Sequence, residues 1–144
     1  MFLVLMIMLA VLVPALPSYA CRCADEGSVA EARDSASVVF VGVTRSHYED
    51  SDIELRERFH WEFEVERAWK GPATRHLRVY LTRADGSLGG CFFPFTVGKR
   101  YLVYAREEPG YPGRFQTSRC SRTSDVLEAE TDLSELGEPI QVFH

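Results

Sequence analysis

The side chains that could bind a metal or act as nucleophiles are few in this chain of 144 residues. Cysteine and histidine each occur four times, as Cys21, Cys23, Cys91, Cys120, His47, His60, His76 and His144. No histidine stands at metal-ligand spacing from another histidine, a cysteine or a carboxylate, so we expect all four to face solvent on strands and loops. The chain also lacks a nucleophile elbow, an H-E-x-x-H motif and a phosphate-binding loop. We therefore predict no catalytic residue, no cofactor and no enzymatic activity.

Three glutamates, Glu62, Glu64 and Glu66, share one face of a predicted strand. Neighbouring carboxylates could serve general acid and base catalysis, but a run of like charges on a strand is more typical of a solvated sheet face. We interpret the three glutamates as such a face, paired across to Arg78 on a neighbouring strand.

The first 20 residues have the pattern of a secretory signal peptide. They carry no charged side chain, and an apolar run over residues 2–13 precedes two prolines. Ser18 and Ala20 provide small residues at the two positions that a signal peptidase reads. The run is short for a membrane span, although an N-terminal membrane anchor is the alternative. We expect cleavage after Ala20 and a secreted protein, periplasmic or extracellular, with one domain over residues 21–144.

Charge and size narrow the function classes further. The formal net charge is −5, with basic and acidic residues interspersed along the chain. A nucleic-acid binder usually concentrates positive charge on one face, so we expect no nucleic-acid partner. Residues 21–144 suffice for one hydrophobic core and hardly for two. We expect a monomer with no membrane span once the leader is removed.

Four cysteines in a secreted chain of this size predict two disulfides, formed in an oxidising compartment. Sequence alone allows three pairings. Cys21 and Cys23 are one residue apart, so a bond between them would be strained, and we expect each to pair with Cys91 or Cys120. A redox or metal-binding role for the C-x-C pair is the alternative. Lipidation of Cys21, as in bacterial lipoproteins, is another, although Tyr19 fits that processing signal poorly.

Strand patterns dominate the mature chain. The clearest one covers residues 59–65, where apolar and polar side chains alternate strictly. Four further strands are expected over residues 38–43, 77–82, 101–105 and 115–118. Five strands with turn signals between them favour a small barrel over a sandwich.

Two helices are expected at the ends of this barrel sequence. Ser28 and Glu31 have the spacing of a capping box, which predicts a short helix ending near Ser35. The second helix is expected to begin at an Asp125 cap and to end at Gly137. The predicted fold class is therefore mainly β, with a five-stranded barrel, a short N-terminal helix, a C-terminal helix and two disulfides.

A mature chain that begins at Cys21 has one more reactive group, its α-amine. The pKa of an α-amine is about 7.7–8, so a useful fraction is neutral at physiological pH. The amine nitrogen and the carbonyl oxygen of Cys21 together could chelate a zinc that keeps an open coordination position, as a catalytic zinc does. Disulfides at Cys21 and Cys23 would hold Arg22 extended, which reduces the entropy cost of binding.

Several motifs together resemble a known family. They are the C-x-C pair at the mature start, the distant Cys91 and Cys120, and the stretches 38–43, 63–71, 98–105 and 120–123. This combination is similar to the tissue inhibitors of metalloproteinases and, more broadly, to netrin-like modules, especially bacterial members. The resemblance covers residues 21–137, with the cysteine spacing as its most specific part.

The resemblance implies an OB-fold-like barrel with the disulfide pairs Cys21–Cys91 and Cys23–Cys120. It also implies that Cys21 binds the zinc of a metalloprotease through its backbone nitrogen and oxygen, while Arg22 enters the pocket beside that zinc. Animal members have a small residue at this position, and a cation is costly to desolvate in an apolar pocket. The implied inhibitory edge consists of Cys21, Arg22, Cys23, Ala24, Ser87, Leu88, Gly89, Gly90 and Cys91.

The expected function is therefore that of a secreted metalloprotease-inhibitor-like protein whose partner is a zinc metalloprotease. The alternative is a netrin-like module of the cell envelope or extracellular space that binds another protein without inhibiting a protease.

Overall fold

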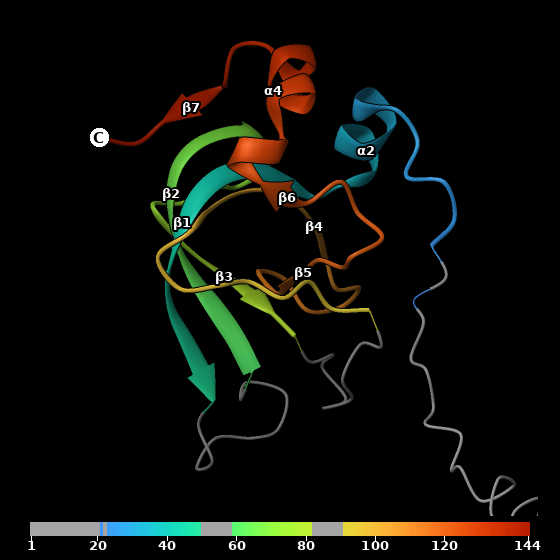
Figure 1. The fold of residues 1–144 in the computed structure, drawn as a ribbon. Helices are drawn as coiled ribbons and strands as arrows, with labels where there is room; N and C mark the ends of the chain where they lie inside the picture. Colours follow the sequence, from blue (N-terminus) through green and yellow to red (C-terminus); the bar gives the residue numbers. More distant parts are fainter. Residues whose placement is uncertain (1–20, 22, 50–58, 82–90) are drawn as a thin grey trace, which may run out of the picture.

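Five strands close into a barrel in the computed structural model, which describes residues 21, 23–49, 59–81 and 91–144 (Figure 1). The strands are β1 (Val38–Glu49), β2 (Phe59–Lys70), β3 (His76–Tyr80), β4 (Arg100–Glu107) and β5 (Phe115–Gln116). Their order is β1-β2-β3-β5-β4, and β4 pairs with β1 to close the ring. Only the pair β3 and β5 is parallel among these neighbours. The predicted fold class, a mainly β OB-fold-like barrel with two helices and two disulfides, is confirmed.

β1 extends well beyond its predicted run, and β2 continues past the alternating stretch that predicts it. β1 continues to Glu49 and β2 to Lys70, because the two strands pair with each other over their whole length. Their register shifts at three places along this pairing. Such β-bulges bend and twist a strand, which lets two 12-residue strands wrap around a small barrel.

β1 and β4 are buried on both faces, which explains why their sequences are continuous apolar runs instead of alternating ones. Phe40 and Val103 point into the barrel, where they pack with Phe63 and other side chains. Val41 and Leu102 lie on the outer face, in a second apolar cluster with residues of the two helices. This second cluster fixes the helices against the barrel.

Helix α2 (Val29–Ser35) has the capping box that the sequence predicts. The Ser28 hydroxyl accepts a hydrogen bond from the Glu31 backbone, and the Glu31 carboxylate accepts one from the Ser28 backbone. The other end of the helix is held by Lys70 of β2, whose ammonium group donates to the carbonyls of Arg33 and Asp34. Both ends of this short helix are therefore fixed by side chains.

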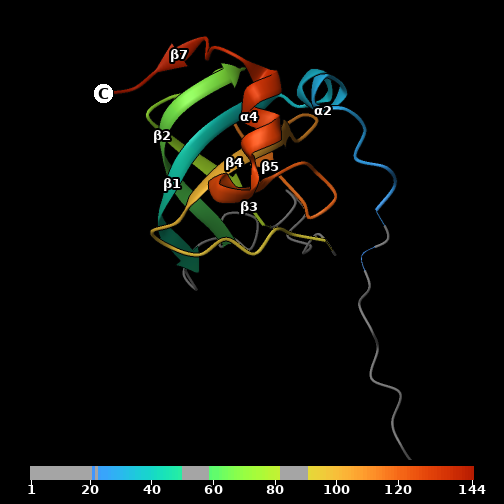
Figure 2. The same ribbon diagram turned by 45° about the horizontal axis from the view of Figure 1, so that its top comes forward.

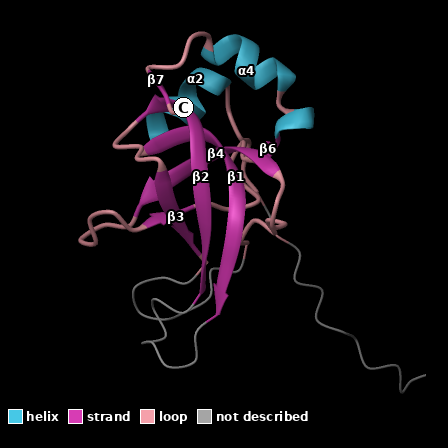
Figure 3. Cartoon of the chain, turned by 90° about the vertical axis from the view of Figure 1, so that its left-hand side faces the viewer, coloured by secondary structure: helices cyan, strands magenta, loops and turns pink. Residues whose placement is uncertain are grey.

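The C-terminal helix differs from the prediction by being divided in two. A 3-10 helix, η1 (Val126–Glu128), is capped by Asp125, and α4 (Glu130–Leu136) follows it. Gly137 ends α4 with a positive φ of 67°, as expected for a glycine after a helix. α2 and α4 lie at the same end of the barrel, and α4 covers β1 and β4 (Figures 2 and 3).

Two short strands escaped the sequence analysis. β6 (Ser124–Asp125) pairs with β4, and β7 (Gln141–Val142) pairs with β2 beyond the end of β3. Two residues are too few to show an alternating pattern, so their pairing is set by the neighbouring strands. Within the described part of the chain, no helix is both long enough and apolar enough to cross a membrane.

Gly71 forms the tight turn after β2, where the chain passes close to the start of β1. Its φ is +85°, and a Cβ atom there would overlap the carbonyl oxygen of Ser37. Only glycine fits this position without moving either strand.

We predict that Gly71→Ala lowers the free energy of unfolding by about 3 kcal/mol, since a left-handed alanine and a steric overlap both add to its cost. Gly110→Ala is the matched control, because Gly110 has a φ of +82° but a Cβ atom placed there would have no neighbouring atom within 4 Å. It should lose only about 1 kcal/mol. Urea unfolding followed by tryptophan fluorescence measures both, and equal losses would contradict the role of the Ser37 overlap.

Candidate functional site

Two disulfides attach the N-terminal segment to the loops that carry Cys91 and Cys120. Cys21 is bonded to Cys91, with their Cα atoms 5.7 Å apart, and Cys23 is bonded to Cys120, at 5.0 Å. These are the pairs that the family resemblance implies. The backbone N–H of Arg119 donates to the carbonyl of Cys91 at 2.8 Å, so the two anchor points are themselves held together.

The described part of the predicted inhibitory edge consists of three cysteines and Ala24. The structure brings Cys21, Cys23, Ala24 and Cys91 to the same side of the barrel through the two disulfides. Arg22, Ser87, Leu88, Gly89 and Gly90 lie outside the described residues.

Residues 23–26 are exposed and bury no side chain between the disulfide and helix α2. The chain then turns at Gly27, whose φ is 68° and whose N–H donates to the Asp25 carboxylate at 3.2 Å. Helix α2 begins two residues later. Because packing contributes little here, the path of the segment depends on its covalent and polar attachments.

One of these attachments comes from Arg122, two residues after Cys120. Its guanidinium group donates to the carbonyl oxygen of Gly27 at 2.9 Å and makes a two-pronged bond to the carboxylate of Asp132, at 2.6 and 2.9 Å. Asp132 belongs to α4 and is 7% exposed. It also accepts a hydrogen bond from the Tyr104 hydroxyl of β4 at 3.0 Å. We call Tyr104, Arg122 and Asp132 the clip.

The contacts within the clip fix the protonation states of Tyr104 and Arg122. Burial, together with the Asp132 carboxylate, raises the pKa of Tyr104 far above its usual value, so the phenol stays neutral and donates. The hydrogen bond to Asp132 likewise raises the pKa of Arg122. Tyr104 and Arg122 therefore both keep their protons at physiological pH, and the clip joins the helix, the barrel and the N-terminal segment.

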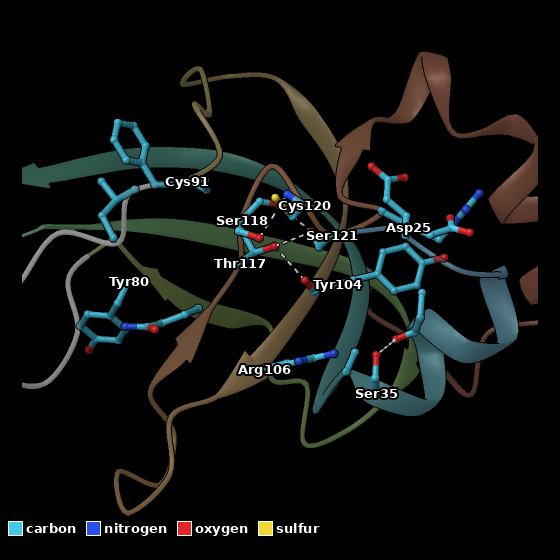
Figure 4. Close-up of a pocket in the computed structure, with 17 residues that line it drawn as sticks. Asp25, Ser35, Tyr80, Cys91, Tyr104, Arg106, Thr117, Ser118, Cys120 and Ser121 are labelled. Carbon is cyan, nitrogen blue, oxygen red and sulfur yellow. Dashed lines mark hydrogen bonds between the residues drawn. The ribbon is translucent and has the colours of Figure 1, made fainter. Parts of the chain in front are cut away.

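The turn that carries Cys120 is rigid for a related reason. The hydroxyl of Thr117 donates to the carbonyl of Tyr104 at 2.7 Å, and the hydroxyl of Ser121 donates to the carbonyl of Ser118 at 2.8 Å. The backbone N–H of Cys120 donates to the Ser118 hydroxyl. Figure 4 shows these hydroxyl groups gathered beside Cys120. The second disulfide is thus bonded to an ordered support.

The glutamate face of β2 forms ion pairs, as expected for a solvated sheet face. Glu62 pairs with Arg78 at 3.2 Å, which confirms that predicted pair. Glu64 pairs instead with Arg45 and Arg75, and Glu66 with Arg100. Hydrogen bonding by Arg45 lowers the pKa of Glu64, so this carboxylate is held ionised and is a poor proton donor.

The prediction that all histidines face solvent is wrong for His60, which is 5% exposed. Its ring stacks on Tyr48 at 5.3 Å and lies 5.4 Å from the ring of Tyr80. The cause is the extension of β1 to Glu49, which brings Tyr48 over the face of β2 that was expected to be wet. His47 and His76 are exposed as predicted. Among the described residues, no group of three histidine, cysteine or acidic side chains is placed to hold a metal ion.

Sequence reasoning missed the clip. Arg122 and Asp132 are ten residues apart and fall in different elements, and Gly27 is 95 residues from Arg122. The only available signal was Arg122 within the stretch 120–123 that carries the family resemblance.

No protein-family model matches the sequence, and no curated protein matches it either.

We predict that Asp132→Asn lowers the free energy of unfolding by about 2 kcal/mol, because it leaves the partly buried charge of Arg122 without its counter-charge. Glu66→Gln is the control, since it removes the same charge from a two-pronged pair with Arg100 that is far more exposed. The side chains of Glu66 and Arg100 are 36% and 52% accessible, whereas those of Asp132 and Arg122 are 10% and 24% accessible. The control should cost less than half as much. Similar losses in urea unfolding would show that the clip adds nothing beyond a surface pair.

Proposed function

We propose that the mature chain is a secreted, netrin-like inhibitor of zinc metalloproteases, similar to the tissue inhibitors of metalloproteinases and of the bacterial type. The backbone nitrogen and oxygen of Cys21 would bind the zinc of the protease. The observation that carries the proposal is the double attachment of Cys21 and Cys23, through disulfides to Cys91 and Cys120, beside a segment that is otherwise exposed.

The chemistry of the proposal needs a free amine at Cys21. In the full chain this nitrogen is an amide, so it becomes a ligand only after cleavage between Ala20 and Cys21. The pKa of an α-amine, about 7.7–8, then leaves enough neutral amine near physiological pH to donate an electron pair to zinc. Two ligands from one residue close a five-membered ring with the metal, which orients Cys21 toward the zinc.

Rigidity supports the proposal as strongly as the ligand atoms do. A flexible N-terminus would lose conformational freedom on entering an active-site cleft, and this loss weakens binding. Here the disulfides fix Cys21 and Cys23, one on each side of Arg22, and the clip fixes Gly27. The entropy loss then occurs on folding and not on binding.

Both disulfides agree with an oxidising compartment, as the signal-like leader predicts. The barrel itself does not identify the function, since one barrel fold serves many functions. The experiment that tests the proposal must therefore change the terminal amine of Cys21.

We predict that a variant with one extra alanine before Cys21 loses at least about two orders of magnitude in metalloprotease inhibition, because its Cys21 nitrogen is an amide that cannot bind zinc. Inhibition constants against a panel of zinc metalloproteases measure the effect. Intact mass of the secreted wild type must first show a chain that begins at Cys21 with no lipid. The extended variant should unfold at the same urea concentration as the wild type, and undiminished inhibition by it would rule out chelation by Cys21.

We predict that Arg22→Thr strengthens inhibition of metalloproteases whose pocket beside the zinc is apolar, by about 1–3 kcal/mol, because a charged side chain no longer has to be desolvated. Arg119→Thr is the control, since Arg119 is exposed and its replacement removes the same charge elsewhere on the surface. Competition between the variants and the wild type for one protease measures the difference. No gain for Arg22→Thr would mean that this side chain does not enter such a pocket.

A second candidate function is a netrin-like module that binds another protein without contacting zinc. A large pocket that adjoins both disulfides favours this function. Binding in that pocket would not require a free amine at Cys21. A wild-type chain that begins upstream of Cys21, or carries lipid on it, would favour this function over the first.

A further inference from the structure

A pocket of about 660 Å³ lies between helix α2, the segment after Cys23 and the turn that carries Cys120 (Figure 4). Cys91 and Cys120 both belong to its lining, so the pocket adjoins the anchor points of the two disulfides. A protein bound at Cys21 would therefore lie beside it.

Most polar groups of the pocket are already engaged within the protein. The hydroxyls of Thr117, Ser118 and Ser121 take part in the turn, and Arg122 is bonded to Asp132 and Gly27. These groups make a preformed polar wall with little donor capacity left for a ligand.

Of the two arginines in the lining, Arg106 is the one without such a bond. This residue of β4 is exposed and lines the pocket, and its side chain makes no hydrogen bond or ion pair with any residue that the structure describes. Figure 4 shows its guanidinium group directed toward the side of the pocket formed by helix α2. An arginine offers several N–H donors in a planar arrangement that matches a carboxylate.

The other end of the pocket is apolar. Tyr80, Leu81 and Phe92 line it, and Phe92 leaves 44% of its surface exposed. The position of Phe92 is defined, because it follows Cys91, whose side chain is in a disulfide and whose carbonyl is bonded to Arg119. An exposed aromatic ring at a fixed place is a common anchor for an apolar side chain of a binding partner.

Acidic residues limit the charge of the occupant. Asp25 and Glu26 line the pocket from the N-terminal segment and are exposed. They would repel a ligand with many negative charges, such as a nucleic acid or a sulfated glycan, far more than a peptide whose single carboxylate is placed at Arg106.

We propose that this pocket binds a peptide segment that carries one acidic and one apolar side chain, with the carboxylate on Arg106 and the apolar group against Phe92. The identification of this segment as part of the inhibited protease rests on the proposed function, whereas binding of the peptide itself does not. The pocket then supplies selectivity among proteases that all present the same zinc to Cys21.

The test uses the mature, disulfide-bonded protein labelled with ¹⁵N and two blocked peptides, acetyl-Gly-Phe-Gly-Glu-Gly-amide and the same peptide with glutamine for glutamate. We expect the glutamate peptide to bind at least fivefold more tightly and to shift the amide signals of Phe92, Arg106 and Thr117. Arg106→Gln should abolish this preference, Arg106→Lys should restore part of it, and Arg119→Gln should leave it unchanged, since Arg119 is exposed but not part of the pocket lining.

Equal binding of the two peptides by the wild type, or a preference that survives in Arg106→Gln, would overturn the proposal. Tighter binding of a heparin fragment than of the glutamate peptide would overturn it as well, because it would make the pocket a polyanion site. The extended variant with alanine before Cys21 should bind the glutamate peptide like the wild type. A preference for the glutamate peptide without any protease inhibition would therefore reject the proposed function and support the peptide site. Protease inhibition without that preference would support the proposed function and reject the peptide site.

Discussion

The exposed segment after Cys23 is held in place by bonds and not by packing, and the proposed site depends on this. Residues 23–26 bury no side chain, so nothing apolar draws them to the barrel. Two disulfides define one end of the segment, and the hydrogen bond from Arg122 to Gly27 defines the other. A segment held in this way can be rigid and still fully accessible, which a buried segment cannot be.

The clip links this segment to the rest of the fold. Arg122 reaches Gly27 only because Asp132 orients its guanidinium group, and Asp132 is in position only because α4 packs on the outer faces of β1 and β4. These strands in turn share their inner faces with the barrel core. The C-terminal helix, which is far from Cys21 in sequence, therefore helps to determine the geometry at the N-terminus.

The periodic parts of the fold could be read from the sequence, and its tertiary contacts could not. Alternation placed β2, continuous apolar runs placed β1 and β4, and the Ser28–Glu31 spacing placed α2. His60 was misplaced because the strand that covers it extends past the predictable run. The spacing of the cysteines argued against a Cys21–Cys23 bond but left two pairings open until the resemblance chose between them. The clip had no local signature, since charge pairing across ten or 95 residues depends on the finished fold.

The linear arrangement of the disulfides has a consequence for how the protein is made. Cys21 and Cys23 leave the ribosome first, yet their partners lie 70 and 97 residues later. Until residue 91 has followed, these two thiols have no partner within the chain except each other, and a strained bond between neighbours is the intramolecular error. Correct oxidation must therefore come late in biogenesis, once β1 to β3 are complete, and it suits a compartment where a wrong first bond can still be exchanged.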